Sequence, residues 1–277
     1  MKNIVAVNTN SYHAFTIDQA LEGIAAAGFD AIEIATVRGW TEHLMPEMDD
    51  AEIDRVAKKA ADLGIKFVGM SGHCNLMFKE RIEDFKNNMK LAHRLGCKYI
   101  NSSVGEAHFG QNETFSDDVL VENIKSLLPL LEEYDMYMSI ETHGNEYGTG
   151  ASLAKIAQGT GSDRIGVCYD TANVVFYGGV RPEEEIKDCM KDVHFVHLKD
   201  KIGYDQSWNF PEVGSGELKL LDVVKYCNEN GMYGPFSMEV EFTEAFVTKE
   251  KTAEDLEYVN ACMKKAHDYM VANGIIN

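Results

Sequence analysis

The stretch from residue 138 to residue 242 decides the fold, because it contains four apolar runs that each carry an acidic residue or a histidine near the end. These segments read MSIETHG (138–144), VCYDTAN (167–173), HFVHLKD (194–200) and FSMEVEF (236–242). Nearly continuous apolar character is typical of strands that are buried on both faces. The four segments therefore predict buried strands with polar side chains at their carboxyl ends.

Similar runs occur four times before residue 138, so the chain contains eight strand candidates. They are Asn3–Asn8, Ala31–Ala35, Lys66–Met70, Tyr99–Ser103, Met136–Glu141, Ile165–Asp170, His194–Leu198 and Phe236–Glu241. Their mean spacing of roughly 35 residues is typical of a repeating unit of one strand and one helix. The sequence therefore predicts eight such units.

Amphipathic segments with apolar residues at helical spacing lie between the strand candidates. Examples are Thr16–Ala27, Asp49–Leu63, Arg81–Leu95, Asp117–Tyr134 and Leu218–Glu229. Four of these helices are followed closely by a glycine, which can adopt the left-handed conformation that ends a helix. These glycines are Gly28, Gly64, Gly96 and Gly231.

Strict alternation of strands and helices predicts parallel strands joined by right-handed crossovers, and eight units suggest closure. We therefore expect an α/β fold, a single (β/α)8 TIM barrel, with residues 1–277 forming one domain. The rival architecture is an open doubly wound sheet. No glycine-rich nucleotide-binding loop follows any early strand, which favours the barrel.

Composition and charge restrict the function classes. A formal net charge of -19 disfavours nucleic-acid binding. No stretch approaches the roughly 20 apolar residues of a membrane span, and the N-terminal apolar run is too short for a secretory signal, so we expect a cytoplasmic protein.

The six cysteines lie far apart without a C-x-x-C pair, which favours buried free thiols. Cys168 lies beside the candidate site and can line it.

Polar residues at the carboxyl ends of barrel strands are candidates for chemistry. Glu141, Asp170, His197 and Glu239 occupy these positions on the last four predicted strands. Three carboxylates around one point repel one another, whereas a divalent cation converts that repulsion into binding, and an imidazole completes the ligand set. We therefore predict one divalent metal, with Mn2+ preferred and Co2+, Mg2+, Fe2+ or Zn2+ as alternatives.

Any one of these side chains, taken alone, is better explained by a salt bridge or a helix cap. The occurrence of all four at consecutive strand ends favours the metal. Glu241 alternates onto the same face as Glu239, so it is an alternative ligand. The Gly-Pro pair before the last strand favours Glu239.

The order Glu, Asp, His, Glu on strands five to eight resembles the sugar isomerase/epimerase superfamily with xylose-isomerase-like barrels. The resemblance covers essentially the whole chain and extends to the loop segments GSGE (214–217) and GMYGP (231–235). It implies that Glu141 and Glu239 are both metal ligands and an acid/base pair, with Asp170 and His197 as the remaining ligands. Such an enzyme removes a proton next to a sugar carbonyl, and its partner is a small-molecule sugar or sugar derivative.

Two departures from the family pattern weaken the assignment as a ketose 3-epimerase. Relatives with that activity carry a histidine three residues after the metal aspartate, where this chain has Asn173. They also carry an arginine soon after the strand-seven histidine, where the nearest basic residues are Lys199 and Lys201.

His143 supports an alternative reading, because alternation places it on the same side of the chain as Glu141. It can orient a neighbouring group or act as a general base. The catalytic subunits of enzymes that cleave oxidised C-glycosides also resemble this barrel, with a metal and a nearby histidine. That lyase reading implies a hetero-oligomer, whereas relatives of the isomerase type imply a homo-oligomer. An endonuclease-IV-like nuclease and a non-catalytic binding module are the remaining alternatives.

Several further residues are candidates for substrate contact at the barrel mouth. The predicted substrate-binding residues are His73, Asn173, Lys199 and Trp208. Trp40 and Phe109 lie in loops where aromatic rings stack on sugars or anchor subunit contacts with equal frequency. His13 is a further candidate, and Glu33 fits a substrate-binding role and a structural role equally well.

Overall fold

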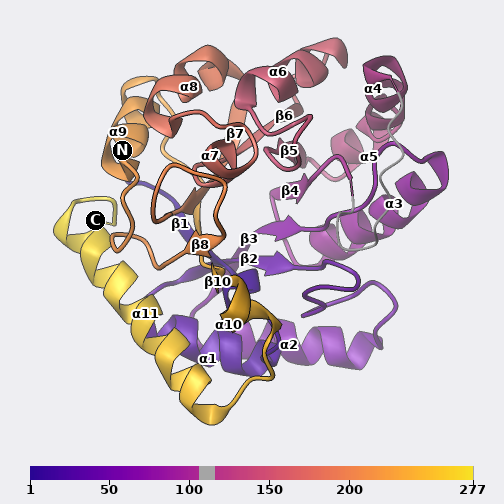
Figure 1. The fold of residues 1–277 in the computed structure, drawn as a ribbon. Coiled ribbons are helices and arrows are strands. Elements are labelled where there is room, and N and C mark those ends of the chain that lie inside the picture. Colours follow the sequence, from indigo (N-terminus) through magenta and orange to yellow (C-terminus); the bar gives the residue numbers. More distant parts are fainter. Residues whose placement is uncertain (106–115, 277) are drawn as a thin grey trace.

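The computed structural model describes residues 1–105 and 116–276, and these contain a closed barrel of eight parallel strands in the order β1-β2-β3-β4-β5-β6-β7-β9. The predicted (β/α)8 TIM barrel is confirmed. The barrel strands are β1 (Val5–Asn8), β2 (Ala31–Ala35), β3 (Lys66–Ser71), β4 (Tyr99–Ser102), β5 (Tyr137–Glu141), β6 (Ile165–Asp170), β7 (Val193–Lys199) and β9 (Phe236–Glu239). Figure 1 shows the helices arranged around this barrel.

The longer helices cover the outside of the barrel and bury their apolar faces against it. They are α1 (Ile17–Ala27), α2 (Asp50–Asp62), α3 (Lys79–Arg94), α4 (Asp117–Lys125), α5 (Leu128–Glu133), α6 (Gly150–Gly159), α8 (Pro182–Cys189), α9 (Leu220–Glu229) and α11 (Ala253–Ala272). Short helical turns complete the described part: η1 (Thr9–Tyr12), α7 (Asn173–Phe176), η3 (Met190–Asp192) and α10 (Glu244–Thr248). None of the helices in the described ranges is both long and apolar enough to cross a membrane.

Local signals in the sequence explain how these helices begin and end. Thr16 and Gln19 form a capping box at the start of α1, which satisfies two amide groups that lack a helical partner. The same helix ends at Gly28, whose φ of 106° is accessible to glycine at little steric cost. The three other glycines predicted to end helices also have positive φ. The prediction that these four glycines end helices is confirmed.

The predicted helix Asp117–Tyr134 is wrong as one continuous element, because α4 ends at Lys125 and α5 begins at Leu128. Pro129 lies in the first turn of α5. Proline has no amide hydrogen, and in a helix interior its ring collides with the carbonyl of the preceding turn. It therefore starts a new helix instead of continuing α4.

The last barrel strand is shorter than predicted, since β9 ends at Glu239 and not at Glu241. Immediately beyond it, the Val240 amide donates to Ser11 Oγ (3.0 Å), and Phe242 has a φ of 57°. The chain then forms β10 (Phe242–Thr243), which pairs antiparallel with β8 (Asn209–Phe210). These two short strands and α10 lie in front of the barrel in the view of Figure 1. They form one wall of the barrel mouth.

Candidate metal centre

Strand register places the polar side chains of the last four barrel strands next to one another. Asp170 on β6 pairs with His197 on β7, and Lys199 on β7 pairs with Glu239 on β9. Paired residues on neighbouring strands point to the same face of a sheet, which here is the inside of the barrel. The end of the barrel at which the strands have their carboxyl termini is therefore lined by charged side chains from β6, β7 and β9.

Glu141, Asp170, His197 and Glu239 converge at this end. One potential ligand atom from each lies within 4.8 Å of the others, and all four residues are buried. His197 Nδ1 lies 2.8 Å from Glu141 Oε1, 3.9 Å from Asp170 Oδ2 and 3.9 Å from Glu239 Oε2. The four side chains thus form a group that can hold a metal ion, while their roles as ligands stay a prediction.

The donor atoms of this group fit a cation. Glu141 Oε2 and Asp170 Oδ2 are buried and have no hydrogen-bond partner among the described residues. The other oxygen of Asp170 is fixed by the amides of Ala172 and Asn173, both at 2.8 Å. His73 Nε2 lies 3.2 Å from Glu141 Oε2 and Lys199 Nζ lies 3.7 Å from Asp170 Oδ2, but neither donates a hydrogen bond to these oxygens. A buried carboxylate oxygen without a hydrogen bond is costly unless something coordinates it. Oxygen and imidazole ligands of this kind suit a divalent ion.

The electrostatics of the group point the same way. Burial raises the pKa of Asp170 to about 7, against the opposing charge of Lys199 and with the help of Glu141 and Glu239. Burial alone would also raise the pKa of Glu141, yet His197 and His73 hold it well below its usual value. Asp170 is therefore the carboxylate of the group that ionises least readily, and repulsion by Glu141 and Glu239 is part of the cause. A cation relieves this repulsion.

Glu33 on β2 holds the far side of the His197 ring. His197 Nε2 lies 2.9 Å from Glu33 Oε2 and 3.1 Å from Glu33 Oε1, and Asn101 Nδ2 donates to Glu33 Oε1 (2.7 Å). Because Nε2 faces Glu33, Nδ1 faces Glu141 and the other residues of the centre. A metal ion bound at Nδ1 would leave the hydrogen on Nε2, where Glu33 would accept it. The sequence left the role of Glu33 open, and the structure places it behind His197.

Lys199 and Asn10 donate hydrogen bonds to the two carboxylate oxygens of Glu239. Lys199 Nζ donates to Glu239 Oε2 (3.2 Å) and to Glu241 Oε2 (2.5 Å). Although burial disfavours its charge, Glu239, Glu241 and Asp170 raise the pKa of Lys199 well above its usual value. On the other side, Asn10 Nδ2 donates to Glu239 Oε1 (2.9 Å). Asn10 was missed in the sequence, where its place directly after the first strand was the available signal.

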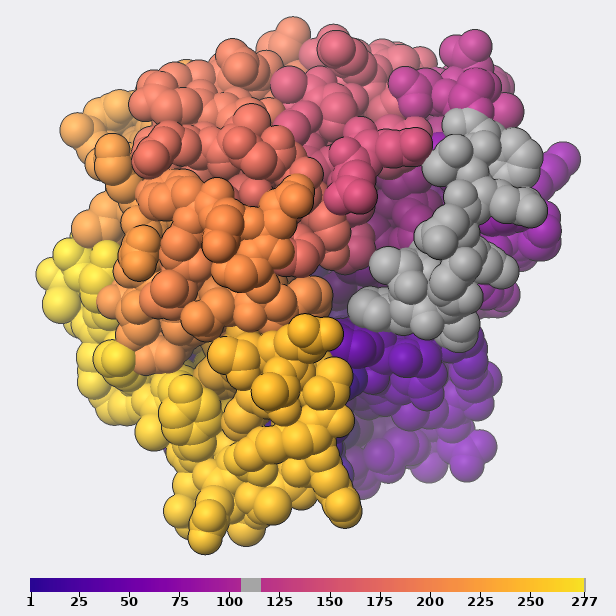
Figure 2. Space-filling model, in the orientation of Figure 1, coloured from indigo at the N-terminus to yellow at the C-terminus, as the bar shows by residue number. Residues whose placement is uncertain are grey.

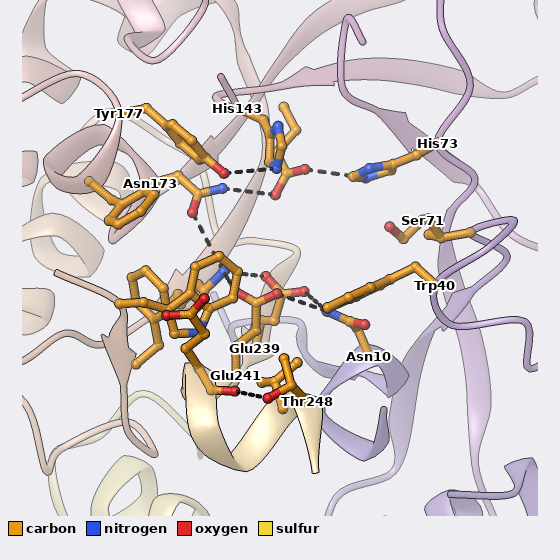
Figure 3. A pocket seen from close by; sticks show the side chains of 18 residues that line it. Asn10, Trp40, Ser71, His73, His143, Asn173, Tyr177, Glu239, Glu241 and Thr248 are labelled. Carbon is orange, nitrogen blue, oxygen red and sulfur yellow. Dashed lines mark hydrogen bonds and ion pairs between the residues drawn. The ribbon is translucent and has the colours of Figure 1, made fainter. Parts of the chain in front are cut away.

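A cavity of about 260 Å³ opens beside these side chains at the barrel mouth. His73 and Trp40 line one side of it, and Asn173 and Tyr177 line the opposite side (Figure 3). On this face of the molecule, the orange segment after β7 and the yellow segment around α10 lie beside the indigo N-terminal segment (Figure 2). Segments far apart in the sequence thus meet around the cavity.

A family model described as "Xylose isomerase-like TIM barrel" matches residues 21–262. The chain belongs to this family. The resemblance predicted from the four strand-end residues is thereby confirmed. No curated protein matches the chain.

Solved structures share the fold of this xylose isomerase-like chain at low sequence identity. D-psicose 3-epimerase, solved in the presence of D-fructose, has a TM-score of 0.76 at 16% identity, with 99% of this chain and 100% of that chain covered. An IOLI protein with a bound zinc atom has a TM-score of 0.75 at 19% identity, covering 99% and 98%. A xylose isomerase-like protein from Mycobacterium smegmatis in complex with magnesium has a TM-score of 0.71 at 16% identity, covering 96% and 98%. These likenesses show the fold.

The residues predicted to bind substrate all line the cavity of this xylose isomerase-like barrel. They are His73, Asn173, Lys199 and Trp208. His73 Nε2 lies 3.2 Å from Glu141 Oε2, and Asn173 Nδ2 lies 3.5 Å from Glu141 Oε1. Trp208 packs edge-on against Phe176 and Phe210, which also line the cavity. Contact with a substrate stays a prediction for each of them.

His143 also lines the cavity, where its Nε2 lies 3.2 Å from the Tyr177 hydroxyl. Burial raises the pKa of that hydroxyl, so Tyr177 is a protonated partner for the ring. Tyr177 was missed in the sequence, because it follows a four-residue helix that has no distinctive pattern. Its position four residues after Asn173 was the available signal.

The aromatic, histidine and cysteine residues that the sequence singled out lie at different distances from the cavity. Trp40 lines the cavity, whereas His13 stacks on Trp40 with ring centroids 4.1 Å apart and donates or accepts at Thr41 Oγ1 (2.8 Å). Phe109 lies outside the described residues. All six cysteines are buried and free, as predicted. Burial raises the pKa of the Cys168 thiol beside His197, which makes it a poor nucleophile.

Proposed function

We propose that this chain is a divalent-metal-dependent sugar isomerase or epimerase, in which Glu141 and Glu239 move a proton next to a carbonyl. The observation that carries the proposal is the pair of buried oxygens that accept no hydrogen bond, Glu141 Oε2 and Asp170 Oδ2, beside the inward-facing nitrogen of His197. Family membership and the shared fold of D-psicose 3-epimerase support it. We place Mn2+ first among the candidate ions, because three carboxylates and one imidazole favour a fairly hard cation.

Glu141, Asp170, His197 and Glu239 would hold the ion. When bound, such an ion withdraws electron density from a substrate carbonyl and makes the adjacent C–H more acidic. The protein itself supplies the orientation of the ligands. Glu33 fixes the His197 ring, and two backbone amides fix Asp170. The arrangement is therefore preorganised before any substrate enters.

Glu141 and Glu239 are suited to proton transfer because they come from β5 and β9 and approach the centre from different strands. Asn10 and Lys199 restrain Glu239, while His197 and His73 contact Glu141. One carboxylate accepts the proton, and the other returns it. Return to the opposite face of the same carbon gives an epimer, and return to the neighbouring carbon gives an isomer.

The cavity suits a small carbohydrate. Its volume of about 260 Å³ lies just below the usual range of about 300–1,000 Å³ for pockets that bind drug-sized ligands. Trp40, Phe176 and Trp208 supply apolar surface, and Asn173 and Lys199 supply polar groups. Aromatic faces beside a few placed polar groups are the usual composition of such a pocket.

One observation favours cleavage of an oxidised glycoside as a second candidate function. His143 and Tyr177 form a hydrogen-bonded pair on the cavity wall, outside the group of four. The pair can exchange a proton with a substrate without involving Glu239. Removal of an α-proton followed by expulsion of a leaving group would then give a lyase.

The test combines metal analysis with deuterium-exchange NMR on simple ketoses, oxidised glycosides and keto-inositols. An isomerase or epimerase incorporates solvent deuterium at one carbon in a metal-dependent reaction and releases no fragment. A lyase releases an aglycone. We expect Glu239→Gln to slow exchange by about 10²–10⁴-fold, whereas Glu257→Gln, on the exposed face of α11, leaves it unchanged.

Metal content is measured on the same samples, so that loss of the ion is not mistaken for loss of the proton-transfer group. Full exchange by a metal-loaded Glu239→Gln variant would exclude the acid/base role of Glu239. Absence of bound metal in the wild-type protein after loading and gel filtration would overturn the proposal as a whole.

A further inference from the structure

Glu241 is a second carboxylate at the edge of the cavity, two residues beyond Glu239. Both side chains line the cavity, and Val240, the residue between them, is buried. Glu241 is not one of the four residues of the candidate metal centre. The proton transfer proposed above gives it no role, although 12% of its side chain is exposed to the cavity region.

Two donors hold Glu241 and Glu239 side by side. Lys199 Nζ donates to the Oε2 atoms of Glu241 (2.5 Å) and Glu239 (3.2 Å). Asn10 Nδ2 donates to the Oε1 atoms of Glu239 (2.9 Å) and Glu241 (3.3 Å). The Thr41 hydroxyl donates to Asn10 Oδ1 (2.6 Å), which fixes the orientation of the amide. Glu241 is therefore held rigidly beside the centre.

The contacts of Glu241 leave acceptor capacity on both oxygens. An ionised carboxylate offers about four lone-pair positions, and the bonds from Lys199 and Asn10 take one on each oxygen. The carboxylate can therefore accept one further hydrogen bond at each oxygen. Two hydroxyl groups on adjacent carbons present donors at a spacing that matches the two oxygens of one carboxylate.

The charge of the cavity wall argues against an anionic ligand at this end. Apart from two histidines, Lys199 is the one basic side chain among the described residues that line the cavity, and it is engaged by Glu239 and Glu241. Glu244 on α10 adds another carboxylate to the same wall. A phosphate group placed there would be repelled at short range.

The apolar part of the same wall suits the C–H surface of a sugar. Trp40, Trp208 and Phe210 line the cavity, and Lys199 Nζ lies 4.7 Å from the centre of the Phe210 ring. Aromatic rings present large apolar surfaces with little flexibility. A neutral ligand with hydroxyl groups on one edge and C–H groups on its faces matches both features.

We propose that Glu241 binds two adjacent hydroxyl groups of an uncharged polyhydroxy ketone and thereby selects unphosphorylated substrates. This inference rests on the proposed function, because that function places the carbonyl end of the ligand at the metal centre. Glu241 then determines specificity, while Lys199 and Asn10 position its carboxylate.

The test is calorimetric titration of the Mn2+-loaded protein with a ketohexose, with monodeoxy ketohexoses that each lack one hydroxyl from C4 to C6, and with a ketohexose phosphate. For the wild type, we expect the ketohexose to bind more tightly than its phosphate. Glu241→Gln should weaken ketohexose binding by about ten- to hundredfold. For the analogue that lacks a hydroxyl bound by Glu241, the same substitution should have a much smaller effect.

Glu241→Asp is the second variant, because it keeps the charge opposite Lys199 while it withdraws the oxygens from the ligand. Glu257→Gln on α11 is the matched control and should bind every ligand as the wild type does. Circular dichroism and metal content show whether each variant is folded and loaded. An equal loss of affinity for all ligands, tighter binding of the phosphate, or no binding of any ketohexose would each overturn the inference.

Deuterium exchange separates this inference from the proposed function. Binding that depends on Glu241 without exchange of any substrate C–H would contradict the proposed function and leave the hydroxyl site intact. Exchange in the wild type together with an unchanged affinity of Glu241→Gln would contradict the hydroxyl site and leave the proposed function intact.

Discussion

The contact between Glu33 and His197 gives a prediction about metal affinity. Glu33 is fully buried and accepts from His197 Nε2, so it fixes the ring and increases the basicity of Nδ1. Loss of such an outer carboxylate typically weakens metal binding by about 10–100-fold. We therefore expect Glu33→Gln to bind Mn2+ about 10–100-fold more weakly than the wild type, measured by competition with a fluorescent chelator.

Glu22→Gln is the control for this experiment, since Glu22 lies on the exposed face of α1 and pairs only with Lys59 among the described contacts. Its metal affinity should equal that of the wild type. Equal affinities of Glu33→Gln and the wild type would show that the His197 ring is held by other contacts.

The residues of the centre differ in how far the sequence can predict them. Glu141, Asp170 and Glu239 end apolar strands, so a barrel model brings them to one face without further information. The contact between Glu33 and His197 joins β2 to β7, and the two residues are 164 positions apart in the sequence. It depends on register across the inside of the barrel, and no local pattern encodes that. The contact between Asn10 and Glu239 also joins distant parts of the chain, and the place of Asn10 after the first strand was its only local signal.

His43 links the loop after β2 to η1 and gives a prediction about stability. Its Nδ1 lies 2.9 Å from Thr9 Oγ1, and its Nε2 lies 3.2 Å from the Phe15 carbonyl oxygen. Because a carbonyl only accepts, Nε2 carries the hydrogen and Nδ1 accepts from the threonine hydroxyl. Burial lowers the pKa of His43 to about 4, and the nearby His13 contributes in the same direction.

The folded protein therefore takes up the His43 proton at lower pH than the unfolded chain, whose histidine titrates near 6.5. Between these values the unfolded state binds more protons, so the free energy of unfolding falls as the pH decreases from about 6.5 to about 4. The full shift corresponds to about 3 kcal/mol. Urea denaturation at pH 7 and pH 4.5, with chelator present, should show a smaller pH dependence for His43→Gln.

The exposed His93 on α3 provides the comparison, because His93→Gln should retain the full pH dependence of the wild type. If His43→Gln and the wild type lose the same stability between pH 7 and pH 4.5, the acid sensitivity arises elsewhere. Each variant is judged by how much its free energy of unfolding changes between pH 7 and pH 4.5. Any loss of stability that is the same at both pH values, such as that from lost hydrogen bonds, therefore cancels.

At the scale of elements, the sequence predicts types better than boundaries. All eight barrel strands lie within the predicted segments or within two residues of them, since a buried parallel strand needs a nearly continuous apolar run. The pairing of β8 with β10 was not predicted, because strands of two residues have no periodicity. This pairing positions Phe210 and α10 at the cavity, so the sequence did not predict the wall of the site that they form.

At the scale of the whole molecule, the net charge of -19 complicates any test of metal binding. An acidic surface attracts divalent cations without a specific site, and such binding is weak and screened by salt. The candidate centre differs because its carboxylates are buried together with an imidazole. Stabilisation by metal should therefore depend on the buried group and persist at high ionic strength.

We expect saturating Mn2+ to raise the Tm of the wild-type protein relative to the chelated protein, measured in 0.5 M KCl to suppress surface binding. At about 100 times Kd the gain is about 2.7 kcal/mol, or roughly 5–10 °C. Asp170→Asn keeps an oxygen for the amides of Ala172 and Asn173 while it removes the charge, so the variant should fold but lose most of this gain. An equal gain in the variant would mean that the stabilisation comes from the acidic surface, and the convergence of four strand ends would then need another explanation.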